Sequence, residues 1–179
     1  APRESGFIVT SNNQATGLLP RIADVQETIT PIEGSWNVYF DPRWGGPGKV
    51  VFDELIDWTV HADTGIRYYS GTAVYHKELN LAMPAQNERL LLRFPRLGSL
   101  ARVWVNGKEV VTVWCSPWEA DITSYVHEGK NNLKIEVVNS LMNRMIGDAS
   151  LPESERFTYA YPQIATPTDK LVPSGIMEQ

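Results

Sequence analysis

Short runs in which apolar and polar residues alternate divide the chain, with the period expected of half-buried β-strands. The run "NNLKIEVVNS" places Leu133, Ile135 and Val137 on one face and Lys134 and Glu136 on the other. No stretch keeps a helical period for more than about two turns. The pattern therefore predicts an all-β protein, with further strands in "GSWNVYF" (34–40), "KVVFDEL" (49–55), "GTAVYHKELNL" (71–81) and "ERLLLRF" (88–94).

The clearest local signal is a hairpin in "ARVWVNGKEVVTVW", residues 101–114. Asn106 and Gly107 are the residue types that adopt the two positive φ angles of a type I′ turn. Alternation in the first strand places Trp104 on the face opposite Val103 and Val105. Trp104 is then either packed under a loop or exposed, and the sequence leaves both open.

Turn residues separate these runs throughout, since the 179 residues include 13 Gly and 12 Pro. We expect one domain over residues 1–179, an antiparallel β-sandwich. Residues 1–33 are expected to supply lead-in strands, in "GFIVTS" (6–11) and "RIADVQETIT" (21–30). Residues 140–179 are expected to form a largely irregular tail that returns to the sandwich through "LVPSGI" (171–176).

Charge and composition exclude several classes of protein. The net charge is −5 with no basic stripe, which argues against a nucleic-acid partner. No window approaches the ~20 apolar residues of a membrane span. Cys115 is the sole cysteine, so no disulfide forms within the chain.

Motifs for catalysis or metal binding do not emerge either. "WGGPGKV" lacks the spacing and the Ser or Thr of a phosphate-binding loop. The histidines His61, His76 and His127 are not at metal-ligand spacing. Nothing places two carboxylates across a cleft as a glycosidase requires. We expect no cofactor and no independent enzyme, and a structural calcium ion held by backbone carbonyls and carboxylates that are separated in the sequence stays open.

Several segments in order resemble a known family: "GSWNVYFDPRWGGPGKVVFDELIDWT", "GIRYYSGTAVYHKELNL", "VWVNGKEV", "PWEADIT", "GKNNLKIEVVNS" and "LVPSGI". Together they resemble the galactose-binding-like jelly-roll sandwich of glycoside hydrolases. The resemblance is stronger to the C-terminal sandwich of family 106 α-L-rhamnosidases and looser to the sugar-binding domain of family 2. In such enzymes the catalytic residues lie on a separate barrel, for which this chain is too short. The resemblance thus implies an accessory module.

Aromatic residues outside the core are the candidates for stacking on the apolar face of a sugar. Trp36 and Tyr75 fit core strands, whereas Trp44 lies in the loop "DPRWGGPG". We predict a carbohydrate-binding site drawn from six residues, namely Trp44, Trp58, Arg67, Tyr69, Trp114 and Trp118. For Arg67 the alternative is a salt bridge to Asp57 or Asp63.

The two tryptophans near the end of the hairpin differ in their expected roles. The resemblance implies that Trp118 closes the end of the sandwich, with Asp121 and Thr123 capping a turn. Trp114, at the edge of its strand, is the better candidate for contact with a ligand or a neighbouring domain. In "NSLMNRMIGD" (139–148), amides and a guanidinium either bind sugar hydroxyls or form an internal network that holds the tail.

These observations predict a non-catalytic carbohydrate-binding module, accessory to a glycoside hydrolase that acts on plant polysaccharide. Its partners would be a poly- or oligosaccharide and a catalytic domain in the same polypeptide. The alternative is a rhamnosidase-like scaffold domain that buttresses the barrel and binds no sugar alone. We expect a secreted or periplasmic bacterial protein.

Overall fold

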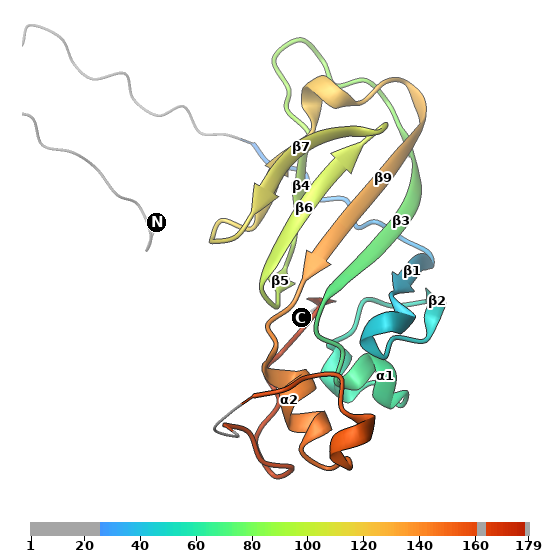
Figure 1. Cartoon of the computed structure of the whole chain (residues 1–179). Helices are drawn as coiled ribbons and strands as arrows, with labels where there is room; N and C mark the ends of the chain where they lie inside the picture. Colours follow the sequence, from blue (N-terminus) through green and yellow to red (C-terminus); the bar gives the residue numbers. More distant parts are fainter. Residues whose placement is uncertain (1–25, 161–163, 178–179) are drawn as a thin grey trace, which may run out of the picture. The chain divides into compact units, whose positions relative to one another are not determined.

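The computed structural model describes residues 26–160 and 164–177 of the chain (Figure 1). Contacts divide the chain into two units, Ala1–Pro31 and Ile32–Gln179, and all the elements below belong to the second. The predicted strand at residues 6–11 and the first half of that at residues 21–30 lie outside the described residues. Residues 26–30 form no strand. A single domain over residues 1–179 stays a prediction.

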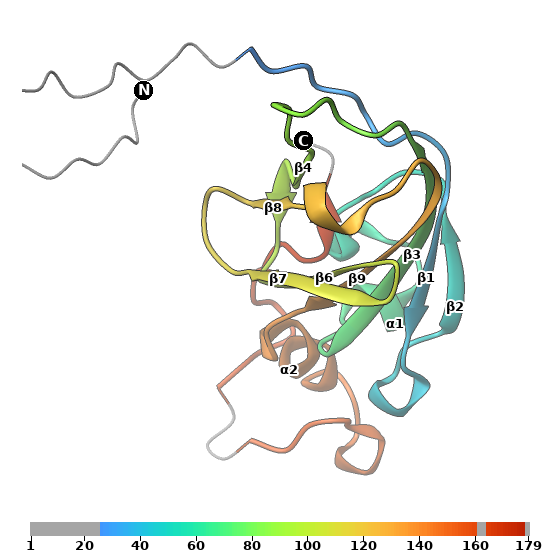
Figure 2. The same ribbon diagram turned by 90° about the horizontal axis from the view of Figure 1, so that it is seen from above.

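Within the described residues, six strands form one antiparallel sheet in the order β2-β1-β3-β9-β6-β7. Two shorter antiparallel pairs, β4–β8 and β5–β10, complete the β structure. Figure 2 shows β4 and β8 on one side of the large sheet. The predicted antiparallel β-sandwich is confirmed. The strands of the large sheet are β1 (Trp36–Phe40), β2 (Gly48–Phe52), β3 (Thr72–Leu81), β6 (Leu100–Val105), β7 (Lys108–Val113) and β9 (Gly129–Val138).

The remaining elements are short. The small strands are β4 (Leu91–Arg93), β5 (Arg96–Leu97), β8 (Glu119–Asp121) and β10 (Ile176–Met177). The α-helices are α1 (Thr64–Arg67) and α2 (Met142–Asp148). The 3₁₀ turns are η1 (Pro42–Trp44), η2 (Trp58–Val60), η3 (Thr123–Tyr125) and η4 (Glu153–Glu155).

Alternation along β9 divides the large sheet into an inner and an outer face, as predicted. Leu133, Ile135 and Val137 are buried, whereas Lys134 and Glu136 between them are only partly covered. Each buried aliphatic side chain of this size contributes about 1.5–3 kcal/mol. The inner face therefore fixes the register of the strand, because a slip by one residue would expose this apolar set.

Aromatic rings fill one part of the core. Trp36 (3% exposed) and Tyr75 (0% exposed) are core residues, as predicted. Phe40 meets Trp58 edge-on with 5.2 Å between ring centroids, and meets Tyr69 edge-on at 5.0 Å. Such edge-to-face pairs add about 0.5–1.5 kcal/mol each beyond their buried area.

The hairpin between β6 and β7 turns at the predicted residues. Asn106 has φ = 51° and Gly107 has φ = 79°, the positive angles of a type I′ turn. The register then shifts between Val103 and Trp104, since Val103 pairs with Val111 and Trp104 with Glu109. Val110 is the extra residue of this bulge, which the alternation of the sequence did not indicate.

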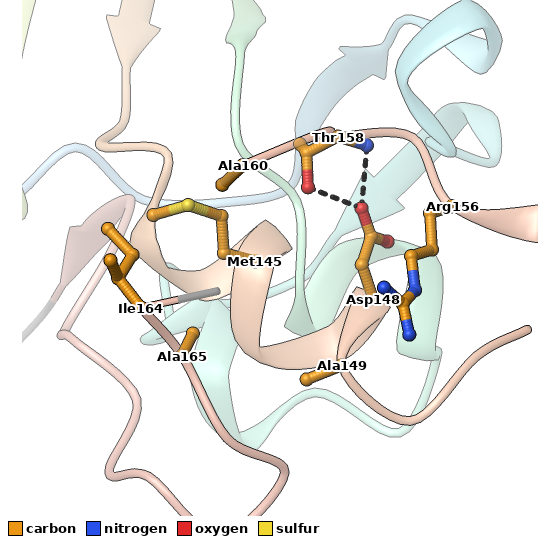
Figure 3. Close-up of a pocket in the computed structure, with 8 residues that line it drawn as sticks. All are labelled: Met145, Asp148, Ala149, Arg156, Thr158, Ala160, Ile164 and Ala165. Carbon is orange, nitrogen blue, oxygen red and sulfur yellow. Dashed lines mark hydrogen bonds between the residues drawn. The ribbon is translucent and has the colours of Figure 1, made fainter. Parts of the chain in front are cut away.

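The polar segment at residues 139–148 holds the tail in place. The sequence had left two roles open for this segment, sugar binding and an internal network. The amide of Asn143 donates to the carbonyl oxygen of Val172 (2.7 Å) and accepts from its N–H (2.8 Å). Asp148 Oδ2 accepts from Thr158 N (2.8 Å) and Thr158 Oγ1 (2.7 Å), as Figure 3 shows. The internal network is thus confirmed, and part of the segment forms helix α2 instead of irregular structure.

Candidate functional site

Two of the six predicted binding residues, Trp58 and Tyr69, are core residues, and their assignment to a ligand site is corrected here. Both side chains are 0% exposed, so neither offers a ring face to a ligand. The segment around Trp58 turns inward because its backbone N–H donates to the carbonyl of Ser174 (3.1 Å), and Asp57 Oδ1 accepts from Ser174 N (3.1 Å). The composition around Trp58 is typical of a loop, and it did not indicate these hydrogen bonds to Ser174, which is distant in the sequence.

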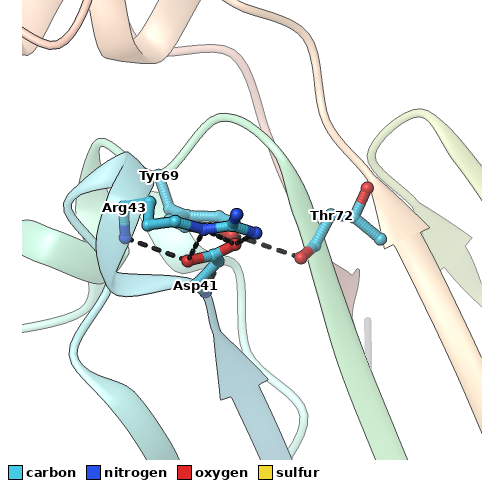
Figure 4. A network of polar contacts seen from close by, with 4 residues as sticks. All are labelled: Asp41, Arg43, Tyr69 and Thr72. Carbon is cyan, nitrogen blue, oxygen red and sulfur yellow. Dashed lines mark hydrogen bonds and ion pairs between the residues drawn. The ribbon is translucent and has the colours of Figure 1, made fainter.

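Tyr69, although buried, supports the loop that carries Trp44 through a hydrogen bond. Its phenolic oxygen accepts from the N–H of Asp41 (3.0 Å) and donates to the carbonyl of Thr72 (3.2 Å) (Figure 4). The Asp41 carboxylate accepts from Arg43 Nη2 at 2.6 Å and from Arg43 N at 2.9 Å. The hydrogen bonds from the Arg43 side chain lower the pKa of Asp41. Trp44 therefore stands on a loop with a fixed base, 47% exposed.

Arg67 and Trp118 are partly buried and have structural partners. Arg67 Nε donates to the carbonyl of His61 at 2.9 Å, a contact that differs from the expected alternatives, Asp57 and Asp63. Trp118 packs against the core, and its carbonyl accepts from Phe94 N at 2.8 Å. This packing fits the structural role that the resemblance implies for Trp118, and contact of Trp118 with a ligand stays a prediction.

The turn after β8 is capped by Asp121 and Thr123, as predicted. Asp121 Oδ1 accepts from Thr123 Oγ1 (2.6 Å) and Thr123 N (3.0 Å). Together with the Arg89 guanidinium, the Thr123 hydroxyl lowers the pKa of Asp121 to about 2. The carboxylate is thus held in its ionised form by hydrogen bonds.

Trp44 and Trp114 do not form one site. Trp44 lies between β1 and β2, and Trp114, which is 70% exposed, follows β7. β2 and β7 are opposite edges of the six-stranded sheet. With about 4.8 Å per strand, the edges are on the order of 24 Å apart. A ligand smaller than the whole sheet contacts one of these tryptophans at most.

The structure instead gathers polar residues around Trp104 on the outer face of the large sheet. Asn37 pairs with His76, His76 with Lys134, and Lys134 with Trp104 across four neighbouring strands. We call these four the outer row. Sequence alternation predicted the outward position of Lys134 and placed Trp104 on the face opposite Val103 and Val105, but the strand order that aligns all four is non-local.

An open depression of about 540 Å³ lies over the outer row. This volume falls within the range of about 300–1,000 Å³ typical of small-molecule sites. By contrast, the cavity beside α2 in Figure 3 measures only about 30 Å³, too small for a sugar ring. The depression is lined by Asn37, His76, Lys77, Glu78, Trp104, Gly107, Asn132, Leu133 and Lys134.

Trp104 is held in place by cations. The Lys134 ammonium lies 3.7 Å from the centroid of the indole ring, and the Arg102 guanidinium carbon lies 5.8 Å from it. Each such contact contributes about 0.5–1 kcal/mol at an exposed site. Lys134 thus lies against the ring, and part of the ring stays exposed.

The charged groups around the depression neutralise one another. Lys134 Nζ lies 3.0 Å from Glu136, and Lys130 Nζ lies 2.9 Å from Glu78. Within residues 26–160 and 164–177, the side-chain amides of Asn37 and Asn132 and the ring of His76 make no hydrogen bond. What the depression offers a ligand is therefore an indole surface with uncharged donors and acceptors.

Residues 26–160 and 164–177 form neither a cluster of metal ligands nor a membrane-spanning helix. Among the described residues, no group of three or more His, Cys, Asp or Glu side chains could hold a metal ion. In the same part of the chain, no helix has the length and apolar character needed to cross a membrane.

Comparison with known families identifies the class of protein. The model of the family described as "Glycosyl hydrolases family 2, sugar binding domain" matches residues 22–176, and the chain belongs to this family. Of the two resemblances in the sequence, this was the looser one. Membership of family 106 stays a prediction.

Individual proteins also resemble the chain. A protein of Formosa agariphila named "Putative beta-glucuronidase" is 39% identical over 123 residues, which cover 68% of this chain and 11% of that protein. The structure of a rhamnosidase from Novosphingobium sp. PP1Y matches with a TM-score of 0.81 and 30% identity, over 90% of this chain and 16% of that one. The chain thus spans a small part of each relative.

A third match supports the fold. The crystal structure of Ruminococcus gnavus β-glucuronidase matches 64% of this chain and 22% of that one, with a TM-score of 0.51 and 24% identity. At this identity the match is evidence for the sandwich and for nothing more specific.

Proposed function

We propose that this chain is a non-catalytic carbohydrate-binding module that is accessory to a glycoside hydrolase acting on plant polysaccharide outside the bacterial cytoplasm. The observation that carries the proposal is the depression on the outer face, in which Trp104 lies beside free amide and imidazole groups. Membership of a sugar-binding domain family supports it.

The chemistry of the depression suits a sugar. Sugars present apolar C–H faces surrounded by hydroxyl groups, and an indole surface packs on such a face. Burial of about 100 Å² of apolar surface gives about 2.5 kcal/mol before entropic costs. A few hydrogen bonds from Asn37, His76 and Asn132 bring the total to about 4–6 kcal/mol, which corresponds to millimolar to tens of micromolar affinity.

The test is calorimetry and affinity electrophoresis of the purified chain against pectic and hemicellulosic polysaccharides, rhamnose-containing ones included. Trp104→Ala, Trp44→Ala and Trp114→Ala are compared with the wild type, and circular dichroism verifies folding. We expect the wild type to bind at least one glycan. A folded wild-type protein that binds none of them contradicts the proposal.

A scaffold role is the second candidate, and exposed apolar side chains around α2 favour it. Tyr159 is 82% exposed, Leu141 50% and Phe157 42%. Exposed apolar surface of this kind is typical of contacts with another domain. If this role holds, the remainder of the parent polypeptide, expressed separately, binds the chain, and Tyr159→Ser weakens that binding while leaving the fold intact.

A further inference from the structure

We propose that the outer face binds an internal stretch of an uncharged glycan chain, which lies across the strands and leaves the sheet at both edges. This inference rests on the proposed carbohydrate binding and adds the class of glycan and its direction. Its basis is the juxtaposition of the outer row with the two edge strands, β2 and β7.

The outer row continues to both edges of the sheet. Val51 on β2 pairs with Asn37, and Glu109 on β7 pairs with Trp104. Both side chains are exposed. The extended row follows one line across six strands, on the order of 24 Å at about 4.8 Å per strand. A line of this length accommodates several consecutive sugar rings.

Neither end of the extended row is closed within the described residues. β2 and β7 each have one neighbouring strand, so no strand stands beyond Val51 or Glu109 as a wall. A site that recognises a chain end needs a group that stops the terminal sugar. The described residues place no such group at either end of the extended row. The row therefore favours a glycan chain that continues beyond both edges of the sheet.

The charge pattern favours an uncharged glycan over an acidic one. Glu136 lies 3.0 Å from Lys134 and 3.8 Å from Arg102, so the cations nearest to Trp104 already face an anion. Glu78 and Glu109 add negative charge near the row, although Lys130 neutralises the first. At the centre of the row, an acidic polymer would meet these carboxylates without an excess of cations to offset them. Lys49, which has no acidic partner among the described residues, lies towards one edge of the sheet, at an outward position of β2 two residues from Val51.

The same face is a poor docking surface for a protein. Protein interfaces have an apolar centre with few charged residues. Of the exposed large hydrophobic side chains in the described residues, Tyr39 and Val51 occupy outward positions of β1 and β2. The centre of the row, by contrast, consists of the polar residues His76 and Lys134 and the partly covered Trp104.

The experiment measures affinity against chain length by calorimetry. The probes are uncharged xylose, mannose, glucose and galactose series of one to six units, each also with its reducing end converted to an alditol, together with galacturonic acid and its oligomers of equal length. For at least one uncharged series, we expect affinity to rise with length and to remain within about twofold after reduction of the end. Oligogalacturonides are expected to bind more weakly.

Variants locate the binding. Trp104→Ala is expected to weaken binding by about tenfold and Asn37→Ala by about threefold. Trp114→Ala is the matched control, because it removes an exposed tryptophan away from the outer row, and it should leave affinity unchanged. Circular dichroism and melting temperature verify that each variant is folded.

The outcomes separate the two proposals. Binding that is lost in Trp114→Ala and kept in Trp104→Ala overturns the inference while the proposed function stands. So does tight binding of a single sugar unit, or a preference for oligogalacturonides. Absence of binding to these probes, with binding to a polysaccharide of the wider panel, overturns the inference alone. Absence of binding to the probes and to the whole polysaccharide panel overturns the proposed function itself.

Discussion

The indole N–H of Trp58 donates to the phenolic oxygen of Tyr75 over 2.7 Å, in a core where both side chains are 0% exposed. The two rings are stacked, with 14° between their planes. Burial raises the pKa of Tyr75, which keeps its hydroxyl neutral. This pair links η2 to β3 and closes the aromatic core.

Removal of the acceptor tests this link. In Tyr75→Phe the Trp58 N–H stays buried without a partner, so the free energy of unfolding should fall by about 1–3 kcal/mol in urea denaturation. Tyr39→Phe is the control, since Tyr39 is 39% exposed on the outer face and its change should stay within about 0.5 kcal/mol. Equal effects of the two variants would show that the hydrogen bond adds nothing.

Two glycines with nearly the same φ angle separate steric from conformational cost. Gly175 and Gly48 have φ of 89° and 87°. A Cβ on Gly175 would lie within 2.7 Å of Trp58 ring atoms, whereas one on Gly48 would meet nothing within 4 Å. Gly48→Ala should cost about 1–2 kcal/mol, and Gly175→Ala should cost a further 1–3 kcal/mol. Thermal denaturation of both variants measures the difference, and equal melting temperatures would contradict it.

Arg144 and Asp148 form a buried ion pair, so we expect a conservative substitution in this pair to lower the stability of the fold strongly. Arg144 Nε lies 3.2 Å from Asp148 Oδ1, without the alignment of a hydrogen bond, and both side chains are at most 6% exposed. Burial lowers the pKa of Arg144. Asp148→Asn removes the neutralising charge and should destabilise the fold by about 3 kcal/mol.

The exposed Glu153→Gln in η4 is the control for that substitution and should have little effect. Limited proteolysis adds a local readout. In Asp148→Asn we expect faster cleavage of the tail, because the Asp148 carboxylate accepts hydrogen bonds from the backbone N–H groups of Phe157 and Thr158. A tail that is cleaved no faster than in the wild type would contradict the anchoring role of Asp148.

Asp121 gives a prediction for acid conditions. Its pKa is about 2 when folded, below the ordinary value of 3.8, chiefly because of the hydrogen bond from Thr123. A depressed pKa contributes stability that is present above about pH 4 and is lost as the pH falls towards 2. In Thr123→Val the pKa of Asp121 should rise towards its ordinary value. An NMR titration of the Asp121 carboxyl carbon measures this, and an unchanged midpoint would assign the shift to Arg89 instead.

Local patterns in the sequence predicted the six strands of the large sheet, the Asn106–Gly107 turn and the buried faces, but not the short strand β5 or the absence of a strand at residues 26–30. Trp58 and Tyr69 were misassigned because the segment around them lacks alternation, and its anchor, Ser174, lies 117 positions away from Asp57. A loop composition says which residues are irregular in backbone, but it does not say which side chains point inward.

The outer row was missed for a related reason. Each of its members stands at an outward position of a strand, which alternation indicates strand by strand. Their alignment depends on β9 lying between β3 and β6, and on the registers of three strand pairs. Non-local pairing of this kind is set by the packing of the whole domain, so single-strand patterns do not contain it.

The position of β10 bears on how the chain folds as it is synthesised. Ser174 binds the backbone of Trp58, and Ile176 pairs with Leu97. The aromatic core is therefore completed only when residues 174–177 have left the ribosome. Until then the indole of Trp58 lacks its cover, and the nascent sandwich exposes apolar surface that favours aggregation.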